Sequence, residues 1–312
     1  EFLVAMNIQS SIDKNSIKAV NNLNALLCIS KVLNEDIVNI TDIHLMKKGM
    51  TNRSFYFQCR GKKYIMRIPG EGTDKLINRK EEASVYRAIA GKDLSDRVLY
   101  INPVNGYKIT EFYRDARVCD AHNKMDVKYC LERLREFHEM KLQVEHEFDL
   151  FAQIEFYESL WQGMPSGYSD YAETKSKVFS LQQYINEHKE EYCLTHIDAV
   201  PDNFLILSDG SVKLIDWEYA AMQDPHVDIA MFAIYSLYDK DQVDSLIDIY
   251  FDGYCPKETR IKIYCYIAVC GLLWSNWCEY KEKLGVKFCE YAYRQYQYAK
   301  DFFDIVQRNL IN

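Results

Sequence analysis

A short hairpin pattern inside an otherwise helical half of the chain constrains the fold more than any other feature. Two apolar runs, Phe204–Leu207 and Val212–Ile215, flank a Ser-Asp-Gly-Ser turn at 208–211. Asp-Gly between apolar runs is typical of a tight β-hairpin. The residue before the first strand and the residue after the second therefore lie side by side at the open end. Those residues are Asn203 and Asp216.

The polar residues around this hairpin predict a site for phosphoryl transfer. His196, Asp198 and Asn203 form the pattern HxDxxxxN. Phosphoryl transfer needs a carboxylate that accepts the proton of the attacking hydroxyl, and metal ligands that neutralise phosphate charge. We assign Asp198 to the first task and His196 to holding the loop. Asn203 and Asp216 supply the hard oxygen ligands that Mg²⁺ takes beside phosphate. The alternative is that each aspartate only caps a turn, as loop aspartates often do.

The rest of the chain changes from strand-like to helical patterns near residues 111–114. After a helical pattern at 16–33, short β-branched and aromatic runs occupy 43–46, 54–59, 63–68 and 108–113, with turns at Gly61 and at 105–106 and one helix at 76–90. Longer helical patterns occupy 124–140, 151–161, 175–191, 242–250, 259–284 and 287–308. This layout predicts an α+β fold of two lobes. Residues 1–113 form a sheet lobe with an extension at 1–34, and residues 114–312 form a helical lobe.

Charge and composition exclude several classes of protein. The net charge is -8, and no Lys/Arg run is long enough to follow a nucleic acid backbone. Ten cysteines without a CxxC pair or Cys/His cluster predict a reduced, cytoplasmic compartment. The most apolar stretch, Ile261–Trp277, is interrupted by Lys262 and Ser275 and predicts a buried helix, with no membrane insertion. The sequence leaves an oligomer open.

The segment LTHIDAVPDNFLILSDGSVKLIDWEYAAMQDPHVDIAMF resembles the kinase-like fold of aminoglycoside phosphotransferases and choline kinases. Within that group, LIDWEYAAMQDP is most similar to choline and ethanolamine kinases. Upstream, KKGMTNRSFYF, YIMRIPGEGTDKLINRKEE and ITEFY resemble bacterial choline kinases that serve the decoration of surfaces with phosphorylcholine. The resemblance covers roughly residues 35 to 300. It implies an ATP-dependent kinase that uses Mg²⁺.

The resemblance also implies roles in the sheet lobe. Arg67 is expected to contact the ATP phosphates while a helical carboxylate holds it. That carboxylate is Glu82, with Glu81 as the alternative, and Arg79 is a competing cation. The turn over the ATP phosphates is expected to consist of Gly49, Thr51, Asn52 and Ser54. The interlobe hinge that binds adenine is expected at Glu111 and Phe112.

A choline-like acceptor needs aromatic faces, because a quaternary ammonium has no N–H to donate. Trp274 and Trp277 are three residues apart on one helical face, and Phe288 and Tyr291 follow. The resemblance implies that these residues line the acceptor pocket. The alternative is an ordinary core stripe, since 14% of the chain is aromatic.

The resemblance implies an acid near the ammonium in the helix after Asp228, and this sequence has Tyr235 there. Either Tyr235 extends the aromatic cage, or another acid such as Glu218 or Glu279 supplies the charge. The leading hypothesis is a choline kinase that forms phosphocholine. The alternatives are an ethanolamine or other amino-alcohol kinase, an aminoglycoside-type phosphotransferase, and a non-catalytic binding module.

Overall fold

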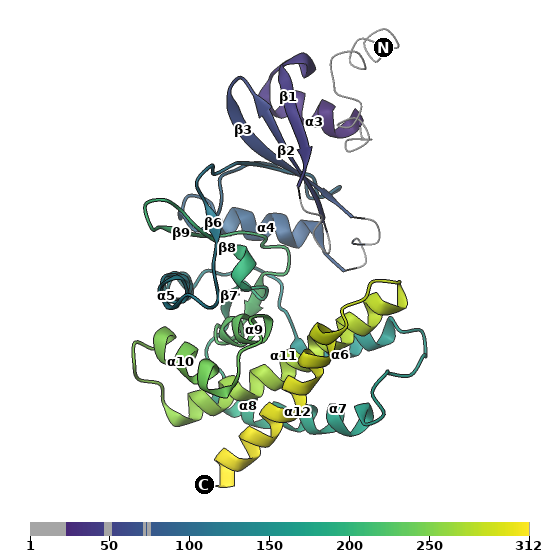
Figure 1. Ribbon diagram of the computed structural model, residues 1–312, viewed down its shortest axis with the longest axis vertical. Coiled ribbons are helices and arrows are strands. Elements are labelled where there is room, and N and C mark those ends of the chain that lie inside the picture. The colour runs from purple at the N-terminus through teal and green to yellow at the C-terminus, as the bar shows by residue number, and fades with distance from the viewer. Residues whose placement is uncertain (1–22, 47–51, 71–72, 74–75, 312) are drawn as a thin grey trace. The chain divides into compact units, whose positions relative to one another are not determined.

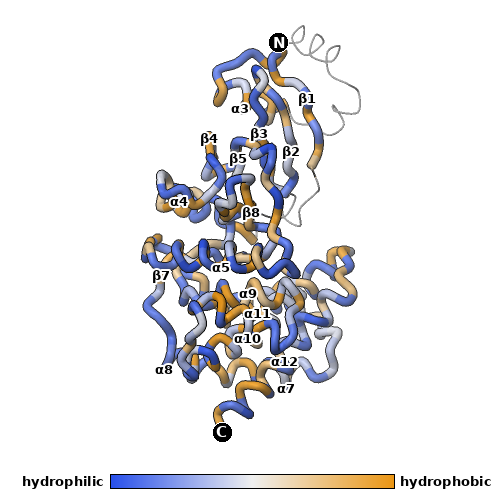
Figure 2. The backbone as a smooth tube through the Cα atoms, turned by 60° about the vertical axis from the view of Figure 1, so that its left-hand side comes forward, coloured by the Kyte–Doolittle hydropathy of each residue, from blue (hydrophilic) through white to orange (hydrophobic). Residues whose placement is uncertain are grey.

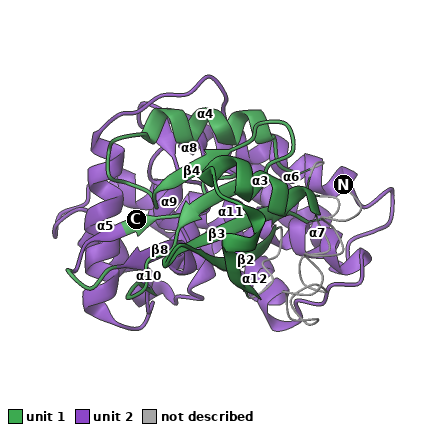
Figure 3. Ribbon diagram, turned by 90° about the horizontal axis from the view of Figure 1, so that it is seen from above, with its two compact units in different colours: residues 1–117, 207–209, 213–218 green, residues 118–206, 210–212, 219–312 purple. Residues whose placement is uncertain are grey.

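The computed structural model describes residues 23–46, 52–70, 73 and 76–311. The chain divides into two compact units, coloured separately in Figure 3. Unit 1 comprises residues 1–117, 207–209 and 213–218, and unit 2 comprises residues 118–206, 210–212 and 219–312. Unit 1 is built on a sheet and unit 2 is mainly helical, which confirms the predicted α+β class (Figure 1). The functional division of the chain at residue 113 stays a prediction.

A five-stranded antiparallel sheet forms the frame of unit 1 (Figure 1). Its strands, in spatial order, are β1 (Ile40–Leu45), β2 (Asn52–Cys59), β3 (Lys62–Pro69), β5 (Lys108–Glu111) and β4 (Val98–Ile101). The four strands expected from the sequence in this region are present, and β4 is an additional one. The 3-10 turn η1 (Ile37–Asn39) leads into β1. The predicted turn at Gly61 is also confirmed: Arg60 and Gly61 have φ of 47° and 75°, as a two-residue hairpin turn requires.

The two faces of this sheet carry different chemistry. Helix α3 (Leu23–Leu33) shares one hydrophobic cluster with Phe57, Met66 and Ile109 of the sheet. Because side chains alternate along a strand, Arg67 points to the opposite face from Met66. Arg67 pairs across the sheet with Lys108, so two cations lie together on the polar face.

Helix α4 (Arg79–Ile89) supplies the acid for that face. Asn78 caps it by accepting hydrogen bonds from the N–H groups of Lys80 and Glu81, at 3.1 and 3.4 Å. This cap explains why the helix begins three residues later than the sequence predicts. Glu82 in its first turn is 1% exposed.

The long helix α11 (Lys257–Lys283) is the centre of unit 2, and α6 (Leu150–Ser159), α9 (Val227–Tyr235) and α12 (Glu290–Ile311) pack against it. Hydrophobic segments gather around α9 and α11 (Figure 2). Within the described part of the chain, α11 alone has the length and composition of a membrane span, but 94% of its apolar window is buried inside the protein. The predicted buried helix is therefore confirmed. The cytoplasmic location stays a prediction.

Helix α11 crosses α12 at very short range at Gly271. A Cβ added there would lie 2.7 Å from the Gln295 carbonyl oxygen and 2.7 Å from the Tyr298 Cβ. Only glycine leaves room for this crossing. The remaining helices of unit 2 are α5 (Lys124–Glu139), α7 (Tyr171–Ser180), α8 (Gln182–His188) and α10 (Lys240–Tyr250).

The prediction of one helix at 175–191 is wrong. The structure has two separate helices, α7 and α8, which meet at Leu181. The Ser180 hydroxyl donates to the Lys177 carbonyl at 2.6 Å, which satisfies one of the last carbonyls of α7. Leu181 is 2% exposed at the junction.

Short strands frame the segment that carries the HxDxxxxN pattern. In unit 2, β7 (Cys193–Thr195) pairs antiparallel with β10 (Ala221–Gln223). The predicted hairpin sequence forms β8 (Phe204–Ile206) and β9 (Val212–Leu214), with Gly210 at a φ of 83° between them. The 3-10 turn η3 (Pro201–Asn203) precedes β8, and the two-residue strand β6 is Arg117–Val118.

Candidate active site

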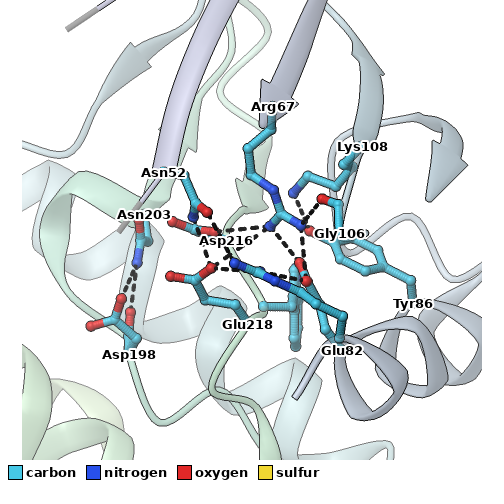
Figure 4. A network of polar contacts seen from close by, with 12 residues as sticks. Asn52, Arg67, Glu82, Tyr86, Gly106, Lys108, Asp198, Asn203, Asp216 and Glu218 are labelled. Carbon is cyan, nitrogen blue, oxygen red and sulfur yellow. Dashed lines mark hydrogen bonds and ion pairs between the residues drawn. The ribbon is translucent and has the colours of Figure 1, made fainter. Parts of the chain in front are cut away.

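A buried ion pair joins β3 to α4 in unit 1 (Figure 4). The two terminal nitrogens of Arg67 donate to the two carboxylate oxygens of Glu82, and the Nη2–Oε2 distance is 2.8 Å. Arg67 Nη2 also donates to the Gly106 carbonyl at 3.0 Å. Burial alone would raise the pKa of Glu82, but the Arg67 guanidinium overcomes it and lowers that pKa to about 2. The predicted Arg67–Glu82 pair is confirmed, while its role at the ATP phosphates stays a prediction.

The expected competitor Arg79 belongs to the same network. Its Nη1 lies 2.9 Å from Glu82 Oε2 and 3.1 Å from Glu218 Oε2. Asn52 Nδ2 donates to Glu218 Oε2 at 2.8 Å, and Arg79 Nη2 donates to Asn52 Oδ1 at 3.2 Å. Asn52 and Glu218 are each 7% exposed. Glu218 is therefore bound by side chains of unit 1.

Asp216 lies beside this network with unusual backbone geometry. Its φ is 63°, a left-handed conformation that costs about 1–2 kcal/mol outside glycine. Its Oδ1 lies 3.7 Å from Arg67 Nη1. Burial and the neighbouring Glu218 carboxylate raise the pKa of Asp216 to about 7, against the charges of Lys108 and Arg67. The ionised form of Asp216 is thus disfavoured unless a further cation is near.

The other residues predicted to bind nucleotide lie on the strands of unit 1. Ser54 on β2 is the cross-strand partner of Arg67. The Glu111 N–H donates to the Arg97 carbonyl at 3.0 Å, and the Phe112 N–H donates to the Lys63 carbonyl at 3.1 Å. Both N–H groups are therefore already bonded within the unit. Gly49 and Thr51 lie outside the described residues.

In unit 2, one buried carboxylate fixes the loop that follows β7. Asp228, at the start of α9 and 0% exposed, accepts the backbone N–H groups of His196 at 2.8 Å and Ile197 at 2.7 Å. His138 Nε2 lies 2.9 Å from the same carboxylate, and His138 Nδ1 lies 2.8 Å from the Tyr250 hydroxyl. Ile197 has a φ of 66°, so this clamp holds a strained turn.

Sequence reasoning gave Asp228 and His138 no role in the site. The available signal was a carboxylate in the first turn of the apolar helix α9. A buried acid of this kind needs hydrogen-bond donors. The His196 side chain is itself fully buried, as a structural member of the loop would be.

Asn203 is oriented by the loop itself. Its Nδ2 donates to the Asp198 carbonyl at 2.9 Å and to Asp198 Oδ2 at 3.0 Å (Figure 4). Because the amide nitrogen is turned toward Asp198, the amide oxygen Oδ1 points elsewhere and remains an acceptor. Asn203 and Asp216 fall in different units, and their pairing at a metal stays a prediction.

The predicted aromatic residues form a continuous series of ring contacts in unit 2. We call these residues the aromatic row: Trp274, Trp277, Phe288, Tyr291 and Tyr235. Successive ring centroids along the row are 5.5, 5.3, 6.5 and 6.1 Å apart. These separations lie in the range of edge-to-face and tilted aromatic pairs.

The members of the row differ in exposure. Trp277 is 1% exposed, and the Lys281 ammonium lies 5.4 Å from its ring centroid. Trp277 is therefore the buried member of the row. The other four members are partly exposed, and at the end of the row the Tyr235 hydroxyl donates to Asp202 Oδ2 at 2.9 Å.

The second acid considered for the acceptor's charge, Glu279, has partners of its own. Its Oε1 accepts the Ser166 hydroxyl at 2.6 Å, and its Oε2 accepts the Gly167 N–H at 2.8 Å. Glu279 is 6% exposed. It therefore holds the loop before α7 against α11.

An antiparallel sheet with a buried Arg–Glu pair, followed by a helical region with an HxDxxxxN loop, defines a kinase-like phosphotransferase. The family model of choline/ethanolamine kinase matches residues 43–267. The chain belongs to the choline/ethanolamine kinase family.

Similar proteins agree with this assignment. The chain is 28% identical over 266 residues to protein LicA of Haemophilus influenzae, covering 79% of this chain and 76% of the relative. It is similar to the crystal structure of the choline kinase LicA from Streptococcus pneumoniae, with a TM-score of 0.77, 28% identity, and coverage of 89% of this chain and 97% of the other. A structure of LicA in complex with AMP gives a TM-score of 0.75 and 26% identity, with 91% and 99% covered. The predicted family and the predicted class of ATP-dependent kinase are confirmed.

Proposed function

We propose that this chain is a choline kinase, which transfers the γ-phosphoryl group of Mg²⁺-ATP to the hydroxyl of choline. The acceptor oxygen bonds to phosphorus, the bond to ADP breaks, and the acceptor's proton leaves to a carboxylate. The observation that carries the proposal is the pairing of Asn203 with Asp198 in a loop whose neighbour Asp202 contacts the aromatic row. The proposed catalytic carboxylate and the aromatic row both belong to unit 2, which supports the proposal.

Asp198 is the proposed base. Asn203 Nδ2 fixes one of its carboxylate oxygens, and Asp228 fixes the backbone that carries it. A base held in this way loses little freedom when the acceptor binds, which is the advantage of a preorganised site. The acceptor hydroxyl would donate to the Asp198 carboxylate and be aligned for attack.

Asn203 Oδ1 and the Asp216 carboxylate are the proposed protein ligands of Mg²⁺. Among the described residues, no group of three or more His, Cys, Asp or Glu side chains is arranged to hold a metal ion. A site of two protein oxygens completed by phosphate oxygens and water suits Mg²⁺. The raised pKa of Asp216 fits this role, because a bound cation would favour its ionised form. Bound Mg²⁺ would neutralise charge on the phosphates.

The polar face of the sheet in unit 1 is the proposed phosphate side. Arg67, held by Glu82, offers a positive charge whose orientation is fixed. Ser54 lies beside it on the neighbouring strand, and Gly49, Thr51 and Asn52 are the proposed turn over the phosphates. At Glu111 and Phe112, adenine would have to use carbonyl oxygens, since both N–H groups are bonded.

The aromatic row is the proposed wall for the acceptor's cationic head. Trp274, Phe288 and Tyr291 present ring faces or edges that are partly exposed, and Tyr235 extends the row to the loop. An ammonium over such rings gains about 0.5–2 kcal/mol per contact. Trp277, the buried member of the row, would support the wall.

Ethanolamine is a second candidate acceptor, and one observation favours it. The row ends at the Tyr235 hydroxyl and the Asp202 carboxylate, which can accept N–H groups of a primary ammonium. The row is therefore not purely aromatic.

Steady-state assays with Mg²⁺-ATP and choline, ethanolamine, thiamine or an aminoglycoside test the proposal. The expected result is the largest kcat/KM for choline. Turnover confined to another acceptor would overturn it. Calorimetric titration with choline or ethanolamine beside a non-hydrolysable ATP analogue separates binding from turnover.

A further inference from the structure

Asp202 is an acid at the junction of the proposed catalytic loop and the aromatic row. It directly precedes Asn203 in η3, and its carboxylate is exposed. The Tyr235 hydroxyl donates to its Oδ2 at 2.9 Å, and the Tyr235 ring meets Tyr291 at a centroid distance of 6.1 Å. One hydrogen bond therefore connects the row to the loop, and all of these residues lie in unit 2.

The hydrogen bond fixes how the Asp202 carboxylate is presented. Burial and the charges of Asp202 and Asp198 raise the pKa of Tyr235 well above its ordinary value. Tyr235 therefore remains a donor at neutral pH. Since Asp202 Oδ2 accepts the Tyr235 hydroxyl, Asp202 Oδ1 is the carboxylate oxygen that is available to a ligand.

The two other acids that compete for this role are engaged elsewhere. Glu218 accepts Asn52 and Arg79 in unit 1. Glu279 accepts Ser166 and Gly167, and on α11 it lies about 160° around the helix from Trp277 and about 140° from Trp274.

Position along the loop also fits a short acceptor. Asp198 and Asp202 are separated by three residues, and the Asn203 amide touches Asp198 while its neighbour Asp202 carries the second acid. The charges of Asp198 and Asp202 both act on the Tyr235 hydroxyl, so a small molecule at this end of the row can place its hydroxyl at Asp198 and its cation at Asp202. A two-carbon amino alcohol has this form.

We propose that Asp202, positioned by Tyr235, is the carboxylate that pairs with the cationic head of the acceptor and selects a charged alcohol over a neutral one. This inference rests on the proposed function. Asp202 is a specificity residue, and Tyr235 acts partly through it as a positioning residue.

The test compares choline with 3,3-dimethylbutan-1-ol, its uncharged carbon isostere, in the wild-type enzyme and in Asp202→Asn. The variant is expected to raise the KM for choline about tenfold and to leave the KM for the isostere and for ATP within about twofold. Tyr235→Phe keeps the ring and is expected to raise the KM for choline about threefold. Asp252→Asn, in an exposed turn, is the control for the loss of one charge and is expected to behave as wild type.

Equal changes for choline and the isostere in Asp202→Asn would overturn the inference, because a lost charge contact cannot affect a neutral molecule. A change in the KM for ATP alone would also overturn it. If the wild type does not turn over choline, the proposed function fails at that step. In that case, choline is titrated into the wild type and into Asp202→Asn in the presence of the ATP analogue, and the two dissociation constants are compared. Equal dissociation constants, or no binding to either protein, would reject the inference about Asp202.

Discussion

Glu82 on α4 receives both terminal nitrogens of Arg67 on β3, and the two side chains are 0% and 5% exposed. The pair fixes the helix to the polar face of the sheet and holds the guanidinium in one orientation. A bidentate contact of this kind is stronger and more directional than a single hydrogen bond. Because the pair is buried, removing either side chain would leave the other as a buried charge without its main partner and would destabilise the fold.

Glu82→Gln is expected to lower the free energy of unfolding by about 3 kcal/mol, because the buried Arg67 charge loses its bidentate partner and keeps only the more distant Asp216 and Glu218 carboxylates. Denaturant titration followed by circular dichroism measures this. Glu81→Gln, one residue earlier and only half-buried, is the matched control and should stay within about 0.5 kcal/mol of wild type. Equal effects of the two variants would contradict the importance of the pair.

Asp198→Asn is expected to lower kcat about 10²–10⁴-fold, as the loss of a general base does. The dissociation constant for ATP should change little, because the proposed phosphate contacts lie at other residues. Steady-state assays and calorimetric titration measure the two quantities. Asp241→Asn, exposed in the first turn of α10, controls for the change in charge. Substantial turnover by Asp198→Asn would remove Asp198 from the role of base.

Gly271→Ala is expected to destabilise the protein by about 1–3 kcal/mol, despite the higher helix propensity of alanine. In an exposed helix the same change would gain up to about 1 kcal/mol. Here the new methyl group would meet the backbone oxygen of Gln295 at 2.7 Å, so α12 would have to move. The midpoint of denaturant unfolding measures the sign. A higher midpoint would show that α11 and α12 accommodate the methyl group.

His226 is expected to make stability depend on pH. Burial lowers its pKa to about 3, although the Asp224 carboxylate opposes the shift. Below the ordinary histidine pKa of about 6.5 the unfolded chain binds a proton that the folded chain does not, so stability falls as pH falls from about 6.5 toward 3. Between pH 7 and pH 5 this loss amounts to about 2 kcal/mol.

His226→Phe tests this expectation, because it keeps an aromatic ring beside Tyr250 and Phe251 and removes the titrating group. Unfolding free energies at pH 7 and pH 5 are compared for both proteins. The variant should lose about 2 kcal/mol less than wild type over this interval. Parallel losses would mean that His226 does not carry the proton.

Local patterns predicted much of the fold and part of the site. Gly61 and Gly210 adopt the positive φ that their turns require, and the apolar stretch from Ile261 became a buried helix. These features depend on neighbours within a few residues, so the sequence carries them directly. The Arg67–Glu82 pair was expected from the family resemblance, with Glu81 as the alternative, and the structure shows that Glu82 is the partner.

Contacts between distant residues were decided only by tertiary structure. The sequence did not predict that Asp228 would bind the backbone of His196, 32 residues away, or that Glu218 would accept Asn52 across 166 residues. The bond from Tyr235 to Asp202 spans 33 residues in the same way. The sequence determined most of the helices and strands, but not β4 or the break between α7 and α8. The partners of the buried and partly buried acids depended on packing, because a carboxylate removed from water is stabilised by whichever donors the fold brings within hydrogen-bond distance.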